Sequence, residues 1–319
     1  MKDAPRAGQL PVPEQGEALA RALAEVAGGT AVAVLMYGSH LNDSSPGSGS
    51  AYDLVVVVEE YGAFHRALKE RGEIHRPLVL FDTLAVVLPP NVIAFTPDEG
   101  RSGMAKCLVI RRDHFENALH ARPRDHFLLG RMIQKVALVW HAGAEVEAWV
   151  QRCLDRARMG IPVWMAPFVD GSFDIDAFGR RTLEVCYRTE IRPEAGNRSQ
   201  AIYEAQREHF RGVLPPVLDQ AVEQGLLEVV QEGRYRYAHP TSRSERLYWR
   251  WHLVRSKLRT TTRWLKHVLT FDNWLPYIVR KVERRTGQTV ELTRLERRWP
   301  IVFLWPRLFR VLKNRPERE

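Results

Sequence analysis

The sequence predicts an α/β fold with a mixed β-sheet, followed by a mainly helical region and a basic helical tail. Runs rich in β-branched and apolar residues alternate with segments of helical spacing through the first part of the chain. One of these runs, 54–58 (LVVVV), is apolar at every position, which is typical of a strand covered on both faces. Beyond residue 144 the strand-like runs give way to helical spacing. The expected strands are 30–36, 54–58, 91–95, 104–111 and 136–141.

Helices are expected between these strands because apolar residues recur there at spacings of three and four. The first such segment ends at Gly28-Gly29, a glycine stop, and the third is closed by Pro89-Pro90. Asp113 is expected to cap a further short helix. We therefore assign residues 1–143 to an α/β domain. The segments with helical spacing are 14–26, 59–71, 76–88 and 125–134.

Residues 144–240 are predicted to form a second, mainly helical domain. Helical spacing covers 145–158, 174–187 and 200–224. Two short strand-like runs, 226–230 and 234–238, meet at Gly233 and predict a hairpin. Helices followed by such a hairpin indicate a winged-helix-like domain. Winged helices bind nucleic acid in some proteins and are packing modules in others, and we favour the packing role here.

The remaining residues, 241–319, carry the basic charge of the chain. They contain 20 Lys and Arg against 7 Asp and Glu, whereas residues 1–240 contain 27 against 31. The segment 242–270 lacks Pro and Gly, and its Arg and Lys residues surround an apolar stripe, which predicts a basic amphipathic helix. Two further Trp-containing segments, 274–285 and 299–312, repeat the pattern. The stripe consists of Leu247, Trp251, Val254, Leu258, Leu265 and Val268.

This tail predicts contact with a polyanionic surface. An anionic membrane is favoured over nucleic acid, because the aromatic residues lie on apolar stripes rather than singly within a basic groove. The alternative is that the apolar faces pack on the rest of the protein. No apolar run approaches the length that spans a bilayer, and the N-terminus lacks signal-peptide and transit-peptide features. We expect a cytoplasmic protein, peripheral on the inner face of the membrane.

The three cysteines, Cys107, Cys153 and Cys186, are scattered without zinc-like spacing. They are therefore predicted to be buried, reduced thiols, as in a cytosolic-type compartment.

The stretch 36–58 contains the candidate functional residues. Gly38 and Ser39 follow the first strand, where a glycine lets the backbone approach a ligand and a hydroxyl joins the peptide N–H groups. Asp53 begins the next strand, with 13 residues between it and Ser39. A carboxylate facing a phosphate-binding loop is a position at which Mg²⁺ is held for nucleotidyl transfer. The alternative is an ordinary Gly/Ser loop between two core strands.

This pattern resembles the nucleotidyltransferase superfamily of DNA polymerase β, whose signature is Gly-Ser, a loop of this length and Asp-x-Asp on a strand. The resemblance is incomplete here. The positions two before and two after Asp53 are Ala51 and Val55, so one carboxylate of the usual pair is missing.

A more specific resemblance is to the mitochondrial translocator assembly and maintenance protein 41 family, which are phosphatidate cytidylyltransferases, also called CDP-diacylglycerol synthases. The run 53–65 (DLVVVVEEYGAFH) matches the single-aspartate strand of that family and the residues that follow it. Further similar segments are 105–109, which keeps a lysine, 129–135 (LGRMIQK) and 187–192 (YRTEIR). The chain departs from the family at His40, where the family has glycine, and in its shortened segment between Pro90 and Lys106.

The resemblance implies that CTP and phosphatidate react to give CDP-diacylglycerol and pyrophosphate, with Mg²⁺ as the cofactor. In this interpretation Asp53 holds the metal, and a second carboxylate could be Asp98, Glu99 or Asp113. The implied roles are catalysis for Asp53 and Lys106, nucleotide binding for Gly38, Ser39, Arg131 and Lys135, and lipid-headgroup binding for Tyr187 and Arg192. Two alternatives stay open: a nucleotidyltransferase acting on RNA or a soluble acceptor, and a catalytically inactive scaffold that binds lipid.

Overall fold

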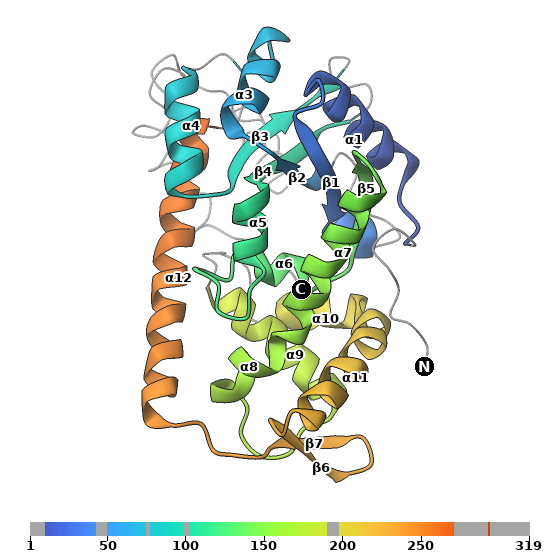
Figure 1. Ribbon diagram of the computed structural model, residues 1–319, viewed down its shortest axis with the longest axis vertical. Helices are drawn as coiled ribbons and strands as arrows, with labels where there is room; N and C mark the ends of the chain where they lie inside the picture. Colours follow the sequence, from blue (N-terminus) through green and yellow to red (C-terminus); the bar gives the residue numbers. More distant parts are fainter. Residues whose placement is uncertain are drawn as a thin grey trace.

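The protein is described from a computed structural model, which covers residues 10–42, 50–74, 77–97, 103–189, 198–270 and 293. Its centre is a five-stranded sheet in the order β3-β4-β2-β1-β5 (Figure 1). Strands β2 and β4 are parallel, and the other neighbouring pairs are antiparallel. The mixed sheet confirms the predicted α/β fold class. The strands are β1 (Ala31–Tyr37), β2 (Tyr52–Val58), β3 (Asn91–Phe95), β4 (Ala105–Arg111) and β5 (Val136–His141).

Both faces of this sheet are covered, which explains the uninterrupted apolar run in β2. Alternate residues of a strand point to opposite faces. Leu54, Val56 and Val58 therefore pack with α1 (Glu14–Val26), α3 (Tyr61–Glu70) and α4 (Leu78–Val87) in one core. Val55 and Val57 pack on the opposite face in a second core, which continues without a break into the helical region.

The helical region lies below the sheet in Figure 1 and ends in a hairpin farthest from the sheet. Its hairpin strands, β6 (Leu227–Gln231) and β7 (Arg234–Tyr237), are antiparallel, and an isolated bridge joins Phe173 to Tyr235. The three cysteines are buried and free, as predicted. The helices from the sheet onward are α5 (Arg112–Ala118), α6 (Leu129–Met132), α7 (Ala144–Met159), α8 (Ile161–Met165), η3 (Ala166–Phe168), α9 (Ile175–Arg188), α10 (Arg198–Ala205) and α11 (Arg207–Glu223).

The structure differs from the sequence-based expectations at three places. The single helix expected over 200–224 is broken at Gln206, whose backbone leaves the helical region at φ −122° and ψ 15°. The helix expected over 125–134 is only α6, because Asp125 instead binds arginines of a distant helix. Asp113 does not cap α5: Arg111 occupies that position, and Asp113 pairs with its guanidinium at 2.6 Å.

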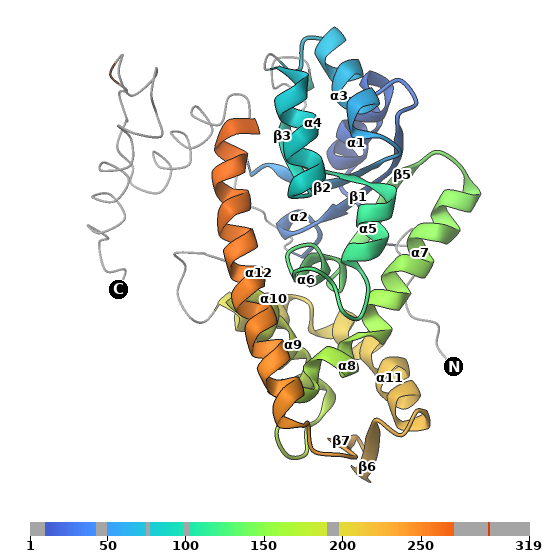
Figure 2. The same ribbon diagram turned by 60° about the vertical axis from the view of Figure 1, so that its left-hand side comes forward.

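The long C-terminal helix α12 (Arg243–Thr270) forms as expected and runs along the side of the molecule past both regions (Figures 1 and 2). The first four residues of its apolar stripe, however, do not pack on the body. Leu247, Trp251, Val254 and Leu258 expose 68%, 69%, 57% and 66% of their surfaces. The buried face is largely polar and basic instead. Among the α12 side chains that the structure describes, the buried ones are Trp249, His252, Ser256, Thr260, Arg263 and Lys266.

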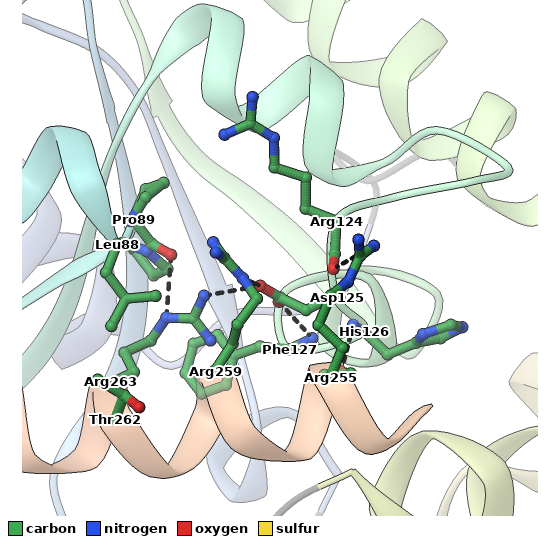
Figure 3. Close-up of polar contacts among 12 residues, drawn as sticks. Leu88, Pro89, Arg124, Asp125, His126, Phe127, Arg255, Arg259, Thr262 and Arg263 are labelled. Atoms are coloured by element: carbon green, nitrogen blue, oxygen red, sulfur yellow. Dashed lines mark hydrogen bonds and ion pairs between the residues drawn. The ribbon is translucent and has the colours of Figure 1, made fainter. Parts of the chain in front are cut away.

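This polar face attaches α12 to the sheet domain. Arg263 donates to the Pro89 carbonyl and, together with Arg259, pairs with Asp125 (Figure 3). The Lys266 side-chain nitrogen donates to carbonyls at the end of α4 and in the turn that follows it, those of Leu84, Leu88 and Pro90. The carbonyls ending a helix carry partial negative charge and attract such a donor, although burial and the neighbouring Arg263 and Arg259 lower the pKa of Lys266 to about 6.

Among the helices that the structure describes, none is both long and apolar enough to cross a membrane. The tail segments 274–285 and 299–312, for which the sequence predicts further amphipathic helices, lie outside the described residues.

Candidate functional site

The central feature is a row of side chains across one end of the sheet. In the strand register, Asp53 of β2 lies opposite Tyr37 of β1 and beside Lys106 of β4. Alternation places all three on the face that packs toward the helical region, where Val55 and Leu108 follow in the next row. Because neighbouring strands lie about 4.8 Å apart, the Asp53 carboxylate and the Lys106 ammonium project side by side.

Gly38 brings the backbone of the following turn against this carboxylate. It has φ +89°, a conformation that L side chains rarely adopt. A Cβ atom placed on Gly38 would lie 2.9 Å from Asp53 Oδ2, which is closer than real Cβ contacts allow. The glycine is therefore required both by the turn and by the close approach. Ser39 then begins the short helix α2 (Ser39–Asn42) and is exposed at the surface.

His40, the position at which the chain departs from the resembled family, has a structural use. Its ring stacks on Tyr52 with 3.8 Å between the ring centroids, and its Nε2 lies 3.1 Å from the Ser50 carbonyl oxygen. The Tyr52 hydroxyl in turn donates to Gln15 of α1 at 2.9 Å. His40 therefore ties α2 to the start of β2, close to Asp53 in sequence.

The structure brings Lys135 to the same turn. Lys135 precedes β5, whose first residue Val136 pairs with Tyr37. Its ammonium group donates to the Leu41 carbonyl of α2 at 2.8 Å. Arg131 is engaged elsewhere: its guanidinium lies over the Phe127 ring at 4.0 Å and donates to the Phe127 carbonyl. Of the two predicted nucleotide-binding cations, Lys135 is therefore the one whose contact with the Gly38 turn is seen.

Tyr187, the predicted headgroup residue, is connected to Lys135 through two glutamines. The Tyr187 hydroxyl accepts from Gln134 Nε2 at 3.4 Å. Gln206 Nε2 donates to Gln134 Oε1 at 3.0 Å, and Gln206 Oε1 accepts from the Lys135 amide at 2.8 Å. Sequence reasoning missed Gln206, because no local pattern marks a buried glutamine at a helix break. Arg192 lies outside the described residues.

The surroundings of this glutamine pair are basic. His209 of α11 is buried beside Gln134. Burial, together with the charges of Arg158 and Lys135, lowers the pKa of His209 to about 3. The ring is therefore neutral at physiological pH, and the positive charge in this region comes from Arg158 and Lys135.

The donor set around Asp53 fits a metal held jointly with a substrate. No group of three or more His, Cys, Asp or Glu side chains is arranged to hold a metal within the part of the chain that the structure describes. Mg²⁺ is commonly bound by one or two carboxylates plus substrate phosphates, so the single Asp53 carboxylate is compatible with it. Asp113 follows the opposite end of β4, about 17 Å or more away along the strands, so it cannot share that metal. Asp98 and Glu99 are not among the described residues.

No family model and no curated protein matches this chain. Among solved structures, the chain is similar to a nucleotidyltransferase-like protein from Exiguobacterium sibiricum 255-15, at 10% sequence identity. The match covers 92% of this chain and 91% of that one, with a TM-score of 0.28. A TM-score this low does not establish a shared fold.

Proposed function

We propose that the protein is a nucleotidyltransferase whose active site is the Gly38 turn and the Asp53–Lys106 pair. One observation carries this proposal: a positive-φ glycine turn approaches a carboxylate so closely that a methyl group would collide with it. A carboxylate that lies against a glycine turn and beside a lysine can hold a cation while the turn and the lysine bind a polyphosphate. An ordinary loop between core strands would not need that approach.

In this proposal the residues position the nucleoside triphosphate and neutralise the charge of its phosphates. The peptide N–H groups and hydroxyl at Gly38 and Ser39 would bind the β- and γ-phosphates of a nucleoside triphosphate. Lys106 would offset negative charge at the α-phosphate while an acceptor oxygen attacks in line and pyrophosphate leaves. Mg²⁺, held by Asp53 and the phosphates, would supply further charge neutralisation when bound. Lys135 would keep α2 in place through the Leu41 carbonyl.

For the substrates we propose CTP and phosphatidate, giving CDP-diacylglycerol and pyrophosphate. The basis is the sequence resemblance of 53–65, 105–109, 129–135 and 187–192. Phosphatidate is found in bilayers, so the enzyme must meet it at an anionic membrane surface on the cytoplasmic side.

The outer face of α12 supports this membrane contact. Its exposed apolar residues recur at spacings of four, three and four from Leu247 to Leu258, a continuous stripe along the helix. Exposed Arg and Lys residues flank the stripe, which disfavours pairing with a second copy of the same helix by like-charge repulsion. An interfacial helix with Trp and Leu on one face and cations beside them suits an anionic bilayer. The flanking cations are Arg243, Arg246, Arg250, Arg255 and Lys257.

The first test is Asp53→Asn, with Asp113→Asn as its matched control. Purified proteins are incubated with Mg²⁺, each of four radiolabelled nucleoside triphosphates and phosphatidate vesicles, and labelled lipid is counted. We expect Asp53→Asn to lose at least about 100-fold in turnover, because a charge-stabilising interaction worth several kcal/mol is removed. Asp113→Asn should keep wild-type turnover.

Wild-type turnover in Asp53→Asn would overturn the proposed site. Transfer to RNA but not to lipid would support the RNA alternative. Absence of transfer to any acceptor by the folded wild-type protein, together with vesicle binding, would favour the inactive scaffold.

The second test concerns the membrane face. Trp251→Ser/Leu258→Ser should fold normally, since both side chains are exposed, but should sediment less with phosphatidate-containing vesicles. Val230→Ser, an exposed apolar residue on the distant hairpin, is the control. Wild-type binding should weaken with salt without vanishing, because the apolar share is insensitive to screening. Equal sedimentation of the double variant and wild type would refute the assignment of this face.

A further inference from the structure

Gln206 joins the helical region to the segment that precedes β5. It occupies the break between α10 and α11, and its side chain is buried. Both polar ends of its amide are bonded to the segment just before β5: Oε1 to the Lys135 amide and Nε2 to Gln134 Oε1. The helical region therefore fixes the two residues that precede β5, Gln134 and Lys135.

The orientation of this amide follows from chemistry. The Lys135 backbone N–H can only donate, so the atom of Gln206 that faces it must be the oxygen. The nitrogen of Gln206 must then face Gln134, which has to present its own oxygen. The Gln134 nitrogen is thereby directed to its remaining partners, the Gly130 carbonyl and the Tyr187 hydroxyl. The Lys135 amide thus determines which atom donates and which accepts in each of these hydrogen bonds.

This chain of bonds joins the two sides of the candidate site. At one end Lys135 holds the Leu41 carbonyl, three residues after Gly38. At the other end Tyr187 projects from α9 of the helical region. Two buried amides are costly to leave unpaired, at about 1–3 kcal/mol for each group, so the arrangement is kept as a unit.

We infer that Gln206 is a positioning residue, which couples Tyr187 on the acceptor side to the Gly38 turn on the nucleotide side through Gln134 and Lys135. This inference rests on the proposed nucleotidyltransferase function. Gln206 itself touches no reacting atom in it. Its effect is to fix where Lys135 holds α2, and so where the peptide groups of the turn lie relative to Asp53.

The test compares Gln206→Leu, which keeps the size but loses both bonds, with Gln206→Glu, which keeps the acceptor for the Lys135 amide. Gln224→Leu, an exposed position at the far end of α11, is the matched control. Two readouts are taken on full-length protein: steady-state KM and kcat with CTP and phosphatidate vesicles, and amide hydrogen exchange by mass spectrometry.

In Gln206→Leu we expect the CTP KM to rise about tenfold and exchange to speed up about tenfold at 38–42 and 134–136, as loss of a buried hydrogen bond allows. Exchange in the distant hairpin should not change. Gln206→Glu should recover only part of the change in exchange at 134–136, because its carboxylate still accepts from the Lys135 amide but cannot donate to Gln134 Oε1. The control should show neither effect.

Unchanged exchange at 38–42 in a folded Gln206→Leu protein would overturn the inference, as would a uniform rise in exchange that reflects general destabilisation. Unchanged KM alongside faster local exchange would equally overturn the positioning role. If the wild-type protein transfers no nucleotide, the proposed function fails first. The exchange comparison then decides separately whether Gln206 holds the Gly38 turn.

Discussion

The attachment of α12 to the sheet domain leads to a quantitative prediction about Asp125. Its carboxylate pairs with Arg263 and Arg259, each at 2.9 Å (Figure 3). The Arg263 side chain is only 1% exposed and that of Asp125 10% exposed. Asp125→Asn would leave a buried guanidinium without its counter-charge. Removing one partner of a buried ion pair costs about 3–5 kcal/mol, so we expect the free energy of unfolding to fall by about 3 kcal/mol or more.

The magnitude can be checked against an exposed pair and a double variant. The Glu17–Arg21 pair spans 3.4 Å with side chains 42% and 67% exposed, so Glu17→Gln should change stability by less than about 1 kcal/mol. Adding Arg263→Met to Asp125→Asn should recover at least about 1.5 kcal/mol, because the orphaned charge is then gone.

Urea unfolding followed by tryptophan fluorescence measures these changes, since Trp164 and Trp249 are fully buried. A loss below about 1 kcal/mol in Asp125→Asn, or additive losses in the double variant, would refute the reasoning. The same contacts mean that removing the chain from residue 242 would expose Asp125 and the carbonyls at the end of α4. A truncation intended to test membrane binding should therefore begin after residue 270.

Two further predictions follow from the backbone and the buried histidines. Gly38→Ala should lose about 1–2 kcal/mol of stability through its positive φ and should also lose activity, because the new methyl group meets Asp53. Gly225→Ala has a similar φ of +70° with open space around it, so it should lose the stability alone; equal activity in the two variants would contradict the close-approach argument. Burial lowers the pKa values of His126 and His209 to about 3. Between that value and the ordinary histidine pKa of about 6.5, the two side chains bind protons in the unfolded chain but not in the folded protein. The free energy of unfolding should therefore fall as the pH drops below about 6.5, by about 1.4 kcal/mol per pH unit for each histidine, and His209→Gln should reduce that slope in urea titrations.

Local pattern determined most of the secondary structure of this protein. The helix at 14–26 and the strand at 136–141 have the bounds that their spacing predicts, because a 3.6-residue or two-residue period is set by which side chains must face the core. The all-apolar run at 54–58 likewise required a strand covered on both faces. Gly38 and Asp53 were identifiable from sequence because a glycine turn and a strand-edge carboxylate are local features.

What only the tertiary structure decided is where polar side chains find partners far away in sequence. The apolar stripe of α12 is evident from the sequence, yet the structure buries the face that carries Arg263 and Lys266. These two residues meet Asp125 and carbonyls at the end of α4, some 140 to 180 residues earlier in the chain. Gln206 breaks a helix that periodicity would continue, since its amide is satisfied by Gln134 and Lys135 across the core. A periodic pattern identifies which face of a helix is apolar and which is polar. Which of the two is buried depends on where the rest of the fold presents donors and acceptors that need partners.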